Sequence, residues 1–414
     1  SYRWYVLGLL TLVYTFNFID RQVLVIVQEQ IREELGLMDW QLGLLSGFAF
    51  ALFYSVLGVP IAHVSERIGR KRVVALSLAA WSLLTALMGA AQNFIQLALL
   101  RIGVGVGEAG GSPPSHSIIS DIFPRRRRAL ALSVFSMGVY LGYLLAYSTG
   151  GWAAETFGWR STFIIAGLPG VLIAVVVALT VREPPRGLAE SGYDAARAAR
   201  LSGPAEPPQF LHTLRQLWSR RSFRYIALAG SLQSLAGYGV GNFMPSFIIR
   251  AHEMTIGDIG WRLALITGLG GAIAILVSGF LTDRLAERTQ SWYALVPALA
   301  IALTVPLAFA VFLTRDTGAM FLAYIPYEML GATWLGASIA VKHSLVGLRQ
   351  RAVASAVLFF LVNLIGLGLG PLLIGTISDL LRPALGDADG LRYAMLATAV
   401  VVKSVCIVYF LLAA

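Results

Sequence analysis

The sequence has 414 residues, of which 57% are hydrophobic and only 13% charged, and its mean hydropathy is +0.73. Soluble domains carry about 25% charged residues, so the composition excludes an ordinary soluble protein and indicates an integral membrane protein. The net charge of +10 does not indicate a nucleic-acid partner, because the basic residues gather in short loops between apolar segments. The single cysteine, Cys406, excludes a disulfide within the chain and a cysteine-based metal site.

Apolar runs of about 20 residues, long enough to cross a bilayer as helices, recur along the chain. The predicted transmembrane helices lie near residues 5–27, 42–64, 73–91, 94–119, 129–152, 161–181, 223–249, 261–282, 292–313, 319–345, 352–379 and 391–412. The first run is long enough to span by itself, so we expect no cleavable signal peptide.

One polar segment, Arg182–Ser222, interrupts this series. Its five prolines and scattered charges are typical of an aqueous linker, with a short surface helix expected around Phe210–Trp218. The segment divides the predicted helices six and six. We therefore expect an N-terminal six-helix bundle at 1–181, a cytoplasmic linker at 182–222 and a C-terminal six-helix bundle at 223–414.

The charges of the connecting segments predict the orientation of the chain. Basic residues follow every even-numbered helix, as in the run Arg125–Arg128, whereas the first connection after an odd-numbered helix carries Glu29, Glu33, Glu34 and Asp39. By the positive-inside rule, the basic connections and both termini face the cytoplasm. The predicted location is a bacterial inner membrane or a plasma membrane.

Two similar turns follow the second helix of each half. Ala62–Arg72 reads A-H-V-S-E-R-I-G-R-K-R, and Gly279–Arg288 reads G-F-L-T-D-R-L-A-E-R. The paired charges of such a turn can hold neighbouring helix ends together. The gating residues predicted from them are Glu66, Arg67, Gly69, Arg70, Asp283 and Arg284. Two six-helix repeats around a linker are typical of a two-domain transporter with its site between the repeats.

Four charged residues lie inside the first and fourth predicted helices, namely Asp20, Arg21, Arg101 and Glu108. Each costs roughly 2.5–3.5 kcal/mol at the centre of a bilayer, so mutual pairing, a wet cavity or a proton or substrate path must justify them. Arg101 and Glu108 are about 10 Å apart along one helix, too far to pair, but both can reach the first helix. Asp20 can meet Arg101 or share protons with Glu108. Arg21 can meet Glu108, and Asn17 lies one turn earlier on the same side.

Burial of one carboxylate near another disfavours ionisation, which is the property that a proton-coupling group needs. Our hypothesis is that Asp20 and Glu108 exchange the coupling protons. Arg21 and Arg101 would then alternate between these carboxylates and an anionic headgroup, which a guanidinium binds with two hydrogen bonds. The alternative is a static cluster of charges that only holds the two helices together.

The second half is more apolar, and a charged half that faces an apolar half suits an amphiphile. Its candidate substrate-binding residues, together with Asn17, Arg21 and Arg101 of the first half, are Gln233, Tyr238, Asn242 and Asn363. Three further charged residues of this half are Glu328, Lys342 and Lys403. They either take part in the site or lie near helix ends, where their side chains reach water, and both interpretations are equally good.

The turn Glu66–Arg72 resembles the signature D-R-x-G-R-[KR]-[KR] of the major facilitator superfamily, with Glu66 in place of the aspartate. Arg101–Gly107 matches the R-x-x-x-G-x-G pattern of that family's fourth helix. Within the superfamily, N-F-I-D-R at Asn17–Arg21 and R-I-G-V-G-V-G-E-A at Arg101–Ala109 resemble the Spinster subfamily. This resemblance implies proton-linked movement of lysophospholipids or sphingoid-type lipids. Hexuronate and other organic-anion carriers share a similar aspartate–arginine start.

The sequence therefore predicts an all-α membrane protein with twelve transmembrane helices in two pseudo-symmetric six-helix bundles, the major facilitator fold, acting as a monomer. Its predicted function is proton-coupled secondary transport, by alternating access, of an anionic amphiphile such as a lysophospholipid or a sphingosine-1-phosphate-like lipid. The alternative cargo is a small organic anion such as a hexuronate. We expect no enzyme activity, cofactor or metal site. A nucleotide-driven pump is not expected either, because the sequence has no P-loop, and the G-x-G-x-x-G at Gly105–Gly110 follows no strand. A transport-dead sensor would need a signalling domain, and no part of the sequence suggests one.

Overall fold

The computed structural model describes residues 2–185, 188–189, 215, 218–219, 221–334 and 357–414. Every regular element among them is helical, and η marks π-helical turns. The first half contains α1 (Tyr2–Leu35), α2 (Asp39–Gly43), η1 (Leu44–Phe48), α3 (Ala49–Ile68), α4 (Arg70–Met88), α5 (Phe94–Glu108), α6 (Ser112–Ile122) and α7 (Arg125–Thr180). The second contains α10 (Arg221–His252), α11 (Ile256–Leu263), η2 (Ala264–Gly270), α12 (Gly271–Ala286), α13 (Trp292–Leu313), α14 (Thr317–Gly331), η3 (Val362–Leu369) and α17 (Gly370–Ala413).

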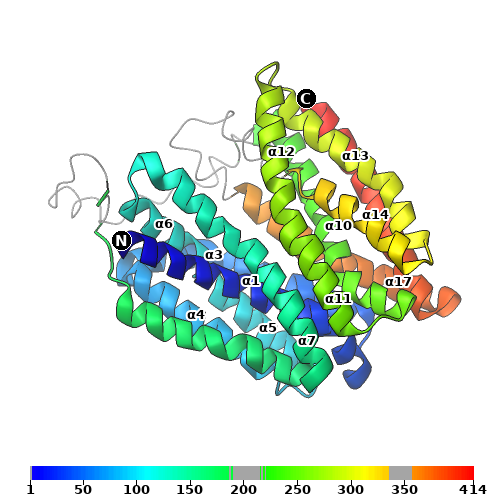
Figure 1. The fold of residues 1–414 in the computed structure, drawn as a ribbon, viewed down its shortest axis with the longest axis horizontal. Helices are drawn as coiled ribbons and strands as arrows, with labels where there is room; N and C mark the ends of the chain where they lie inside the picture. Colours follow the sequence, from blue (N-terminus) through cyan, green and yellow to red (C-terminus); the bar gives the residue numbers. More distant parts are fainter. Residues whose placement is uncertain (1, 186–187, 190–214, 216–217, 220, 335–356) are drawn as a thin grey trace.

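Eight helical segments of the described residues are long and apolar enough to cross a membrane. Two of the helices, α7 and α17, turn back on themselves at Gly158 and Gly386 (Figure 1), where φ is +77° and +83°. Glycine has no Cβ and adopts such a φ without steric cost. Each of these helices therefore supplies two of the predicted spans, and the all-α class is confirmed.

The predicted fourth helix, 94–119, is divided into two. α5 ends at Glu108, and α6 begins at Ser112 with Pro113 and Pro114 in its first turn. Proline has no N–H to donate, so it is tolerated at the start of a helix but breaks a continuing one. The break places Glu108 at the end of α5.

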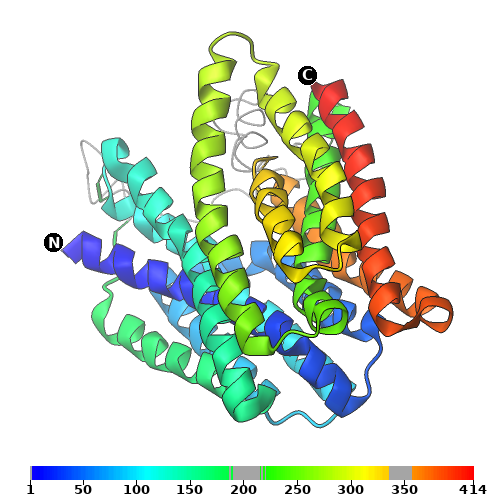
Figure 2. The same cartoon turned by 45° about the vertical axis from the view of Figure 1, so that its right-hand side comes forward.

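The two halves lie side by side and meet at one end, called here the closed end, while their other ends diverge toward the two chain termini (Figures 1 and 2). Among the described residues, the hydrogen bonds between halves join positions 28–46 to positions 242–250 and 378–387. Apolar packing agrees, since Ile26, Phe243 and Phe312 belong to one buried cluster. The halves are therefore joined at the closed end.

The two similar turns differ in their contacts. Gly69 has φ +99°, and the buried Arg70 beside it binds Asp121, Glu183 (2.8 Å) and the carbonyl oxygen of Pro184 (2.6 Å). This ties the first residues after α7 to the N-terminal half. Arg67 is exposed, and the side chain of Glu66 is outside the described residues. In the other turn, Asp283 and Arg284 are exposed, and the Tyr293 hydroxyl lies 3.5 Å from Asp283. The surface helix expected at Phe210–Trp218 falls mostly outside the described residues.

Candidate substrate and proton site

α1 and α5 bring three of the predicted site residues into contact. Arg21 Nε donates a hydrogen bond to Glu108 Oε2 at 2.7 Å, and Asn17 Nδ2 donates to the same oxygen at 2.8 Å. Glu108 is fully buried and Arg21 is 8% exposed. The expected pairing of Arg21 with Glu108 is therefore present. Glu108 Oε1 and Asn17 Oδ1 have no hydrogen-bond partner among the described residues, so half of the bonding capacity of this carboxylate is unused.

Aromatic rings hold the Arg21 guanidinium in place. Its central carbon lies 4.6 Å from the centre of the Phe50 ring, 4.7 Å from that of Tyr54 and 5.0 Å from that of Phe18. A desolvated guanidinium gains about 2 kcal/mol from such ring contacts. Arg101 also faces the Phe50 ring, at 4.8 Å. Phe50 thus contacts both arginines.

Asp20 and Arg101 meet differently from the expectation. Arg101 donates to the backbone oxygens of Leu45 (3.2 Å) and Asp20 (3.4 Å), not to the Asp20 carboxylate. Asp20 is 1% exposed, and neither of its carboxylate oxygens receives a hydrogen bond from the described residues. Its polar neighbours are Trp81 and Thr85 of α4. A buried carboxylate that receives no hydrogen bond costs free energy in its ionised form. The Asp20 side chain is thus buried without a hydrogen-bond donor among the described residues.

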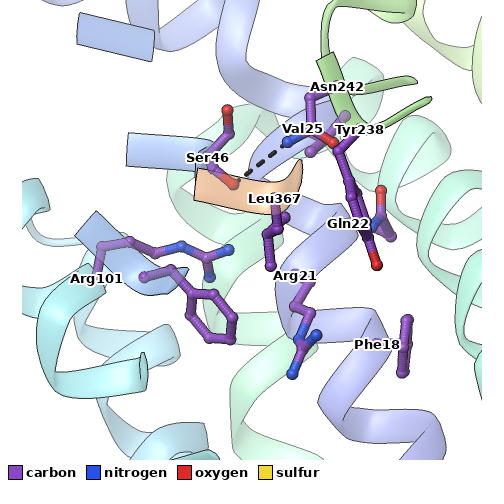
Figure 3. Close-up of a pocket in the computed structure, with 10 residues that line it drawn as sticks. Phe18, Arg21, Gln22, Val25, Ser46, Arg101, Tyr238, Asn242 and Leu367 are labelled. Atoms are coloured by element: carbon purple, nitrogen blue, oxygen red, sulfur yellow. Dashed lines mark hydrogen bonds between the residues drawn. The ribbon is translucent and has the colours of Figure 1, made fainter. Parts of the chain in front are cut away.

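A pocket lies between the two halves, directly beside Arg21 and Arg101 (Figure 3). Its cavity volume is about 10 Å³, roughly the space of one water molecule. The first half lines it with Phe18, Arg21, Gln22, Val25, Ser46, Phe50 and Arg101, and the second half with Tyr238, Asn242 and Leu367. Asn242 also donates to the Ser46 carbonyl oxygen at 3.3 Å, as Figure 3 shows. The pocket joins basic groups of one half to polar groups of the other.

Three of the predicted substrate-binding residues, Asn17, Gln233 and Asn363, do not line this pocket. Gln233 is buried within the C-terminal half and donates to the Gly331 carbonyl oxygen at 3.0 Å. Asn363 is part of η3 and does not line this pocket. Ser46 and Phe50 were not predicted as site residues, because a serine or a phenylalanine does not stand out in an apolar segment.

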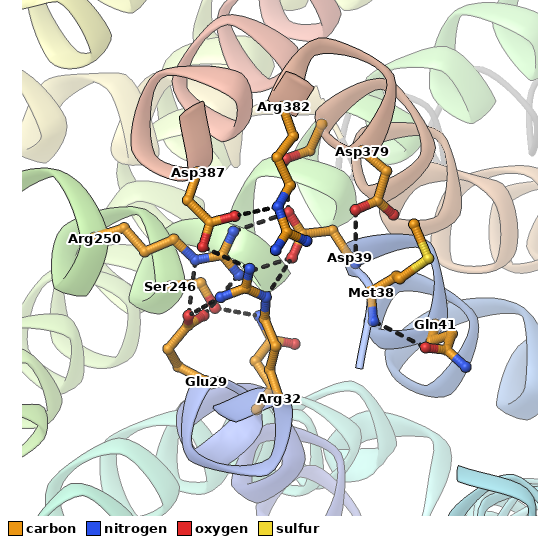
Figure 4. A network of polar contacts seen from close by, with 12 residues as sticks. Glu29, Arg32, Met38, Asp39, Gln41, Ser246, Arg250, Asp379, Arg382 and Asp387 are labelled. Atoms are coloured by element: carbon orange, nitrogen blue, oxygen red, sulfur yellow. Dashed lines mark hydrogen bonds and ion pairs between the residues drawn. The ribbon is translucent and has the colours of Figure 1, made fainter. Parts of the chain in front are cut away.

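A second polar group, the closed-end network, consists of Glu29, Arg32, Asp39, Arg250 and Asp387 (Figure 4). Arg250 of the second half binds Glu29 and Asp39 of the first half through four hydrogen bonds of 2.8 Å. Arg32 reaches Glu29 at 3.1 Å, Asp39 at 3.3 Å and Asp387 at 2.6 Å. The ion pairs connect the two halves at the end where they meet.

This network corrects one interpretation of the sequence. Glu29 and Asp39 were assigned to an acidic connecting loop, but Glu29 lies within α1 and is 2% exposed, and Asp39 begins α2 and is fully buried. α1 continues to Leu35, well past the predicted end at residue 27. A buried carboxylate requires a cationic partner. That partner, Arg250, lies so far away in the sequence that the local pattern around Glu29 and Asp39 gives no sign of it.

Lys403 provides a second correction. One interpretation of the sequence places this side chain near a helix end, where it reaches water, but Lys403 is 1% exposed and lies ten residues before the end of α17. Glu328 is partly buried. Lys342 is outside the described residues.

An all-helical membrane protein with two groups of helices around buried charges has the architecture of a secondary transporter. The Major Facilitator Superfamily profile matches residues 10–371, and the chain belongs to this superfamily.

Relatives by sequence are transporters, not enzymes. An MFS-type efflux pump of Mycolicibacterium smegmatis is 33% identical over 396 residues, covering 95% of this chain and 88% of the relative. The probable galactarate/D-glucarate transporter of Bacillus subtilis is 28% identical, covering 70% and 67%. The sphingosine-1-phosphate transporter SPNS2 of Danio rerio is 26% identical, covering 92% and 77%.

A solved structure supports the resemblance to the Spinster subfamily. It is a bacterial homologue of the human lysosomal transporter Spinster in an inward-facing and unoccupied conformation. The TM-score is 0.89 at 31% identity, and the match covers 100% of this chain and 97% of that one. The predicted fold and family resemblance are confirmed.

Proposed function

We propose that this protein is a proton-coupled secondary transporter of an anionic amphiphile, which binds between the two halves and crosses by alternating access. The observation that carries the proposal is the position of Arg21 and Arg101. Both line the pocket between the halves, and the carboxylates Asp20 and Glu108 are buried behind them.

Charge balance supports proton coupling. The charges of the two arginines and the two carboxylates sum to zero when all four groups are ionised. An anionic headgroup would add one negative charge in a site with little water, which is unfavourable unless it is compensated. One proton on Asp20 or Glu108 restores neutrality. Protonated Glu108 also binds Arg21 less strongly, so the guanidinium becomes available to the headgroup.

The lining of the pocket supports an amphiphile. Phe18, Phe50 and Leu367 provide apolar walls beside the two arginines, so a headgroup can meet the guanidinium groups while an alkyl chain packs on the rings. The similarity to a sphingosine-1-phosphate transporter points to the same class.

The second candidate cargo is a small sugar acid. Gln22, Ser46 and Asn242 also line the pocket and suit hydroxyl groups, and one relative is a probable galactarate/D-glucarate transporter. In proteoliposomes we expect sphingosine 1-phosphate, but not D-glucarate, to accumulate when a pH gradient is imposed. Uptake of D-glucarate alone would select the second candidate.

The Asp20→Asn variant tests the coupling. It should lose gradient-driven uptake while its folded yield in detergent stays at the wild-type level, because asparagine has nearly the shape of aspartate but cannot exchange a proton. Asp389→Asn is the matched control, since that carboxylate is 46% exposed and pairs with Arg392 at 3.1 Å. Full gradient-driven uptake by Asp20→Asn would instead assign the four charges the static role.

A further inference from the structure

Lys403 is a buried cation that the site described above does not use. It lies in the second arm of α17, ten residues or about 15 Å from the end of the helix, and is 1% exposed. A lysine so placed cannot extend its ammonium group to water. A charge held inside a membrane protein is costly and usually serves a function.

The contacts of Lys403 are incomplete. Its Nζ lies 3.2 Å from Thr304 Oγ1 of α13 and 3.7 Å from the centre of the Tyr327 ring of α14. Within the described residues, no carboxylate lies within 4.0 Å of it. The nearby Tyr327 hydroxyl is buried and has no hydrogen-bond partner among these residues. The ammonium group therefore has no direct ion pair among the described residues, and its positive charge can attract an anion at longer range.

Glu328 is the anionic group that faces this cation. It follows Tyr327 on α14, and its Oε2 lies 3.4 Å from the Tyr324 hydroxyl. Glu328 is partly exposed, whereas Lys403 is buried. The ionisable groups within electrostatic range of Glu328 are Lys403 on α17, Tyr324 and Tyr327 on α14, and Tyr140, Tyr143 and Tyr147 on α7; Lys403 also faces Cys406.

The three tyrosines of α7 belong to the N-terminal half, so Glu328 faces the interface between the halves. Tyr147 donates to Gln22 Oε1 at 3.0 Å, and Gln22 lines the pocket next to Arg21. Tyr147 therefore lies within electrostatic range of Glu328 and bonds to a residue that lines the first site.

We propose that Glu328, with Lys403 behind it, is a second proton-exchanging site, located in the C-terminal half and facing the pocket between the halves. A proton from water adds to a Glu328 carboxylate oxygen and later returns to water, and the Lys403 ammonium group compensates the carboxylate in its ionised state. This inference rests on the proposed proton-coupled transport and assigns that transport a further coupling residue.

Infrared spectroscopy of the protein in lipid vesicles tests the site without any cargo. Between about pH 4 and 9, the wild type should show a protonated-carboxyl C=O band that titrates and is missing in Glu328→Gln. Glu328→Asp should retain such a band, and Tyr324→Phe should shift its frequency, because the hydroxyl contacts Oε2. Lys403→Met should extend the band to higher pH, since the compensating cation is gone.

The matched control is Glu287→Gln at the exposed end of α12. Identical titrating bands in wild type and Glu328→Gln would overturn the proposal.

Transport in proteoliposomes provides the second measurement, with sphingosine 1-phosphate and D-glucarate as probes. One coupled proton supports about tenfold accumulation per pH unit, that is 1.36 kcal/mol. Glu328→Gln should therefore accumulate about tenfold less probe at a gradient of one unit, while probe exchange without a gradient persists. If Glu328→Gln accumulates as much probe as the wild type while Asp20→Asn loses accumulation, the role of Glu328 is overturned and the proposed function is not. If wild-type uptake of both probes ignores the gradient, the proposed function fails, and the infrared band still decides whether Glu328 exchanges protons.

Discussion

Arg21 has two kinds of partner, a carboxylate and aromatic rings, and their geometry explains why arginine occupies this position. The Nε atom binds Glu108, and Phe50 and Tyr54 lie within 5 Å of the guanidinium carbon. A planar, delocalised cation suits both kinds of contact, whereas the compact ammonium group of lysine cannot reproduce them.

Arg21→Lys should therefore lower uptake even though the charge is kept. A hydrogen bond to a charged group contributes about 1.5–3 kcal/mol, so we expect at least about a tenfold loss of the uptake rate at low cargo concentration. Arg262→Lys is the matched control, since Arg262 is exposed and lies over the Phe321 ring, 4.9 Å from its centre. Wild-type uptake by Arg21→Lys would mean that charge alone is sufficient at this position.

At the scale of helices, two features hold elements in place. Arg70, at the start of α4, binds Asp121 of α6 and the first residues after α7. At the closed end, the N-terminus of α2 meets α17, where the backbone N–H groups of Asp39 and Trp40 donate to Asp379 at 3.1 and 2.8 Å. A carboxylate at a helix N-terminus is favoured by the helix dipole.

Arg70→Met should loosen the segment that directly follows α7. Removing one partner of a buried ion pair costs about 3 kcal/mol or more, so we expect a lower melting temperature and faster tryptic cleavage between residues 182 and 222. Exposed Arg126 supplies the control variant Arg126→Met. An unchanged cleavage rate would show that the contacts of Arg70 do not restrain this segment.

Gly375→Ala should separate α17 from α2. A Cβ at this position would lie 2.2 Å from the backbone oxygen of Asp39, a distance that rigid backbone does not allow. We expect a wider distance between spin labels at Met38→Cys and Leu385→Cys, measured by electron paramagnetic resonance in a Cys406→Ser background. In contrast, Gly279→Ala has open space around the new methyl group and should leave the distance unchanged. An unaltered distance in Gly375→Ala would show that the backbone adjusts locally.

At the scale of the whole molecule, the closed-end network joins the two halves. Five charged side chains link the two halves, and Arg250 makes four of the bonds. Four of these side chains are at most 9% exposed, and the fifth, Asp387, is 40% exposed. Buried pairs are screened little by salt, so the network should persist at high ionic strength.

Arg250→Met should open the closed end. Loss of about 3 kcal/mol changes an equilibrium constant by about two orders of magnitude, so the same spin labels should report a much larger open population. Arg382→Met is the control, because Arg382 is 43% exposed and its pair with Asp387 lies at the rim. Equal distance distributions in Arg250→Met and wild type would assign the network no part in holding this end closed.

The amino-acid sequence alone determined the membrane class, the repeated helices and the charges within the first and fourth helices. These features follow from local hydropathy and from the cost of isolated charge in lipid, and both can be evaluated one segment at a time. Only the tertiary structure decided the partners. Arg250 binds Glu29 from 221 residues away in the sequence, Lys403 lies beneath Tyr327, and Arg101 binds the backbone of Asp20 instead of its carboxylate. Such contacts depend on how the helices rotate and approach one another, and side-chain packing across the whole molecule sets that arrangement.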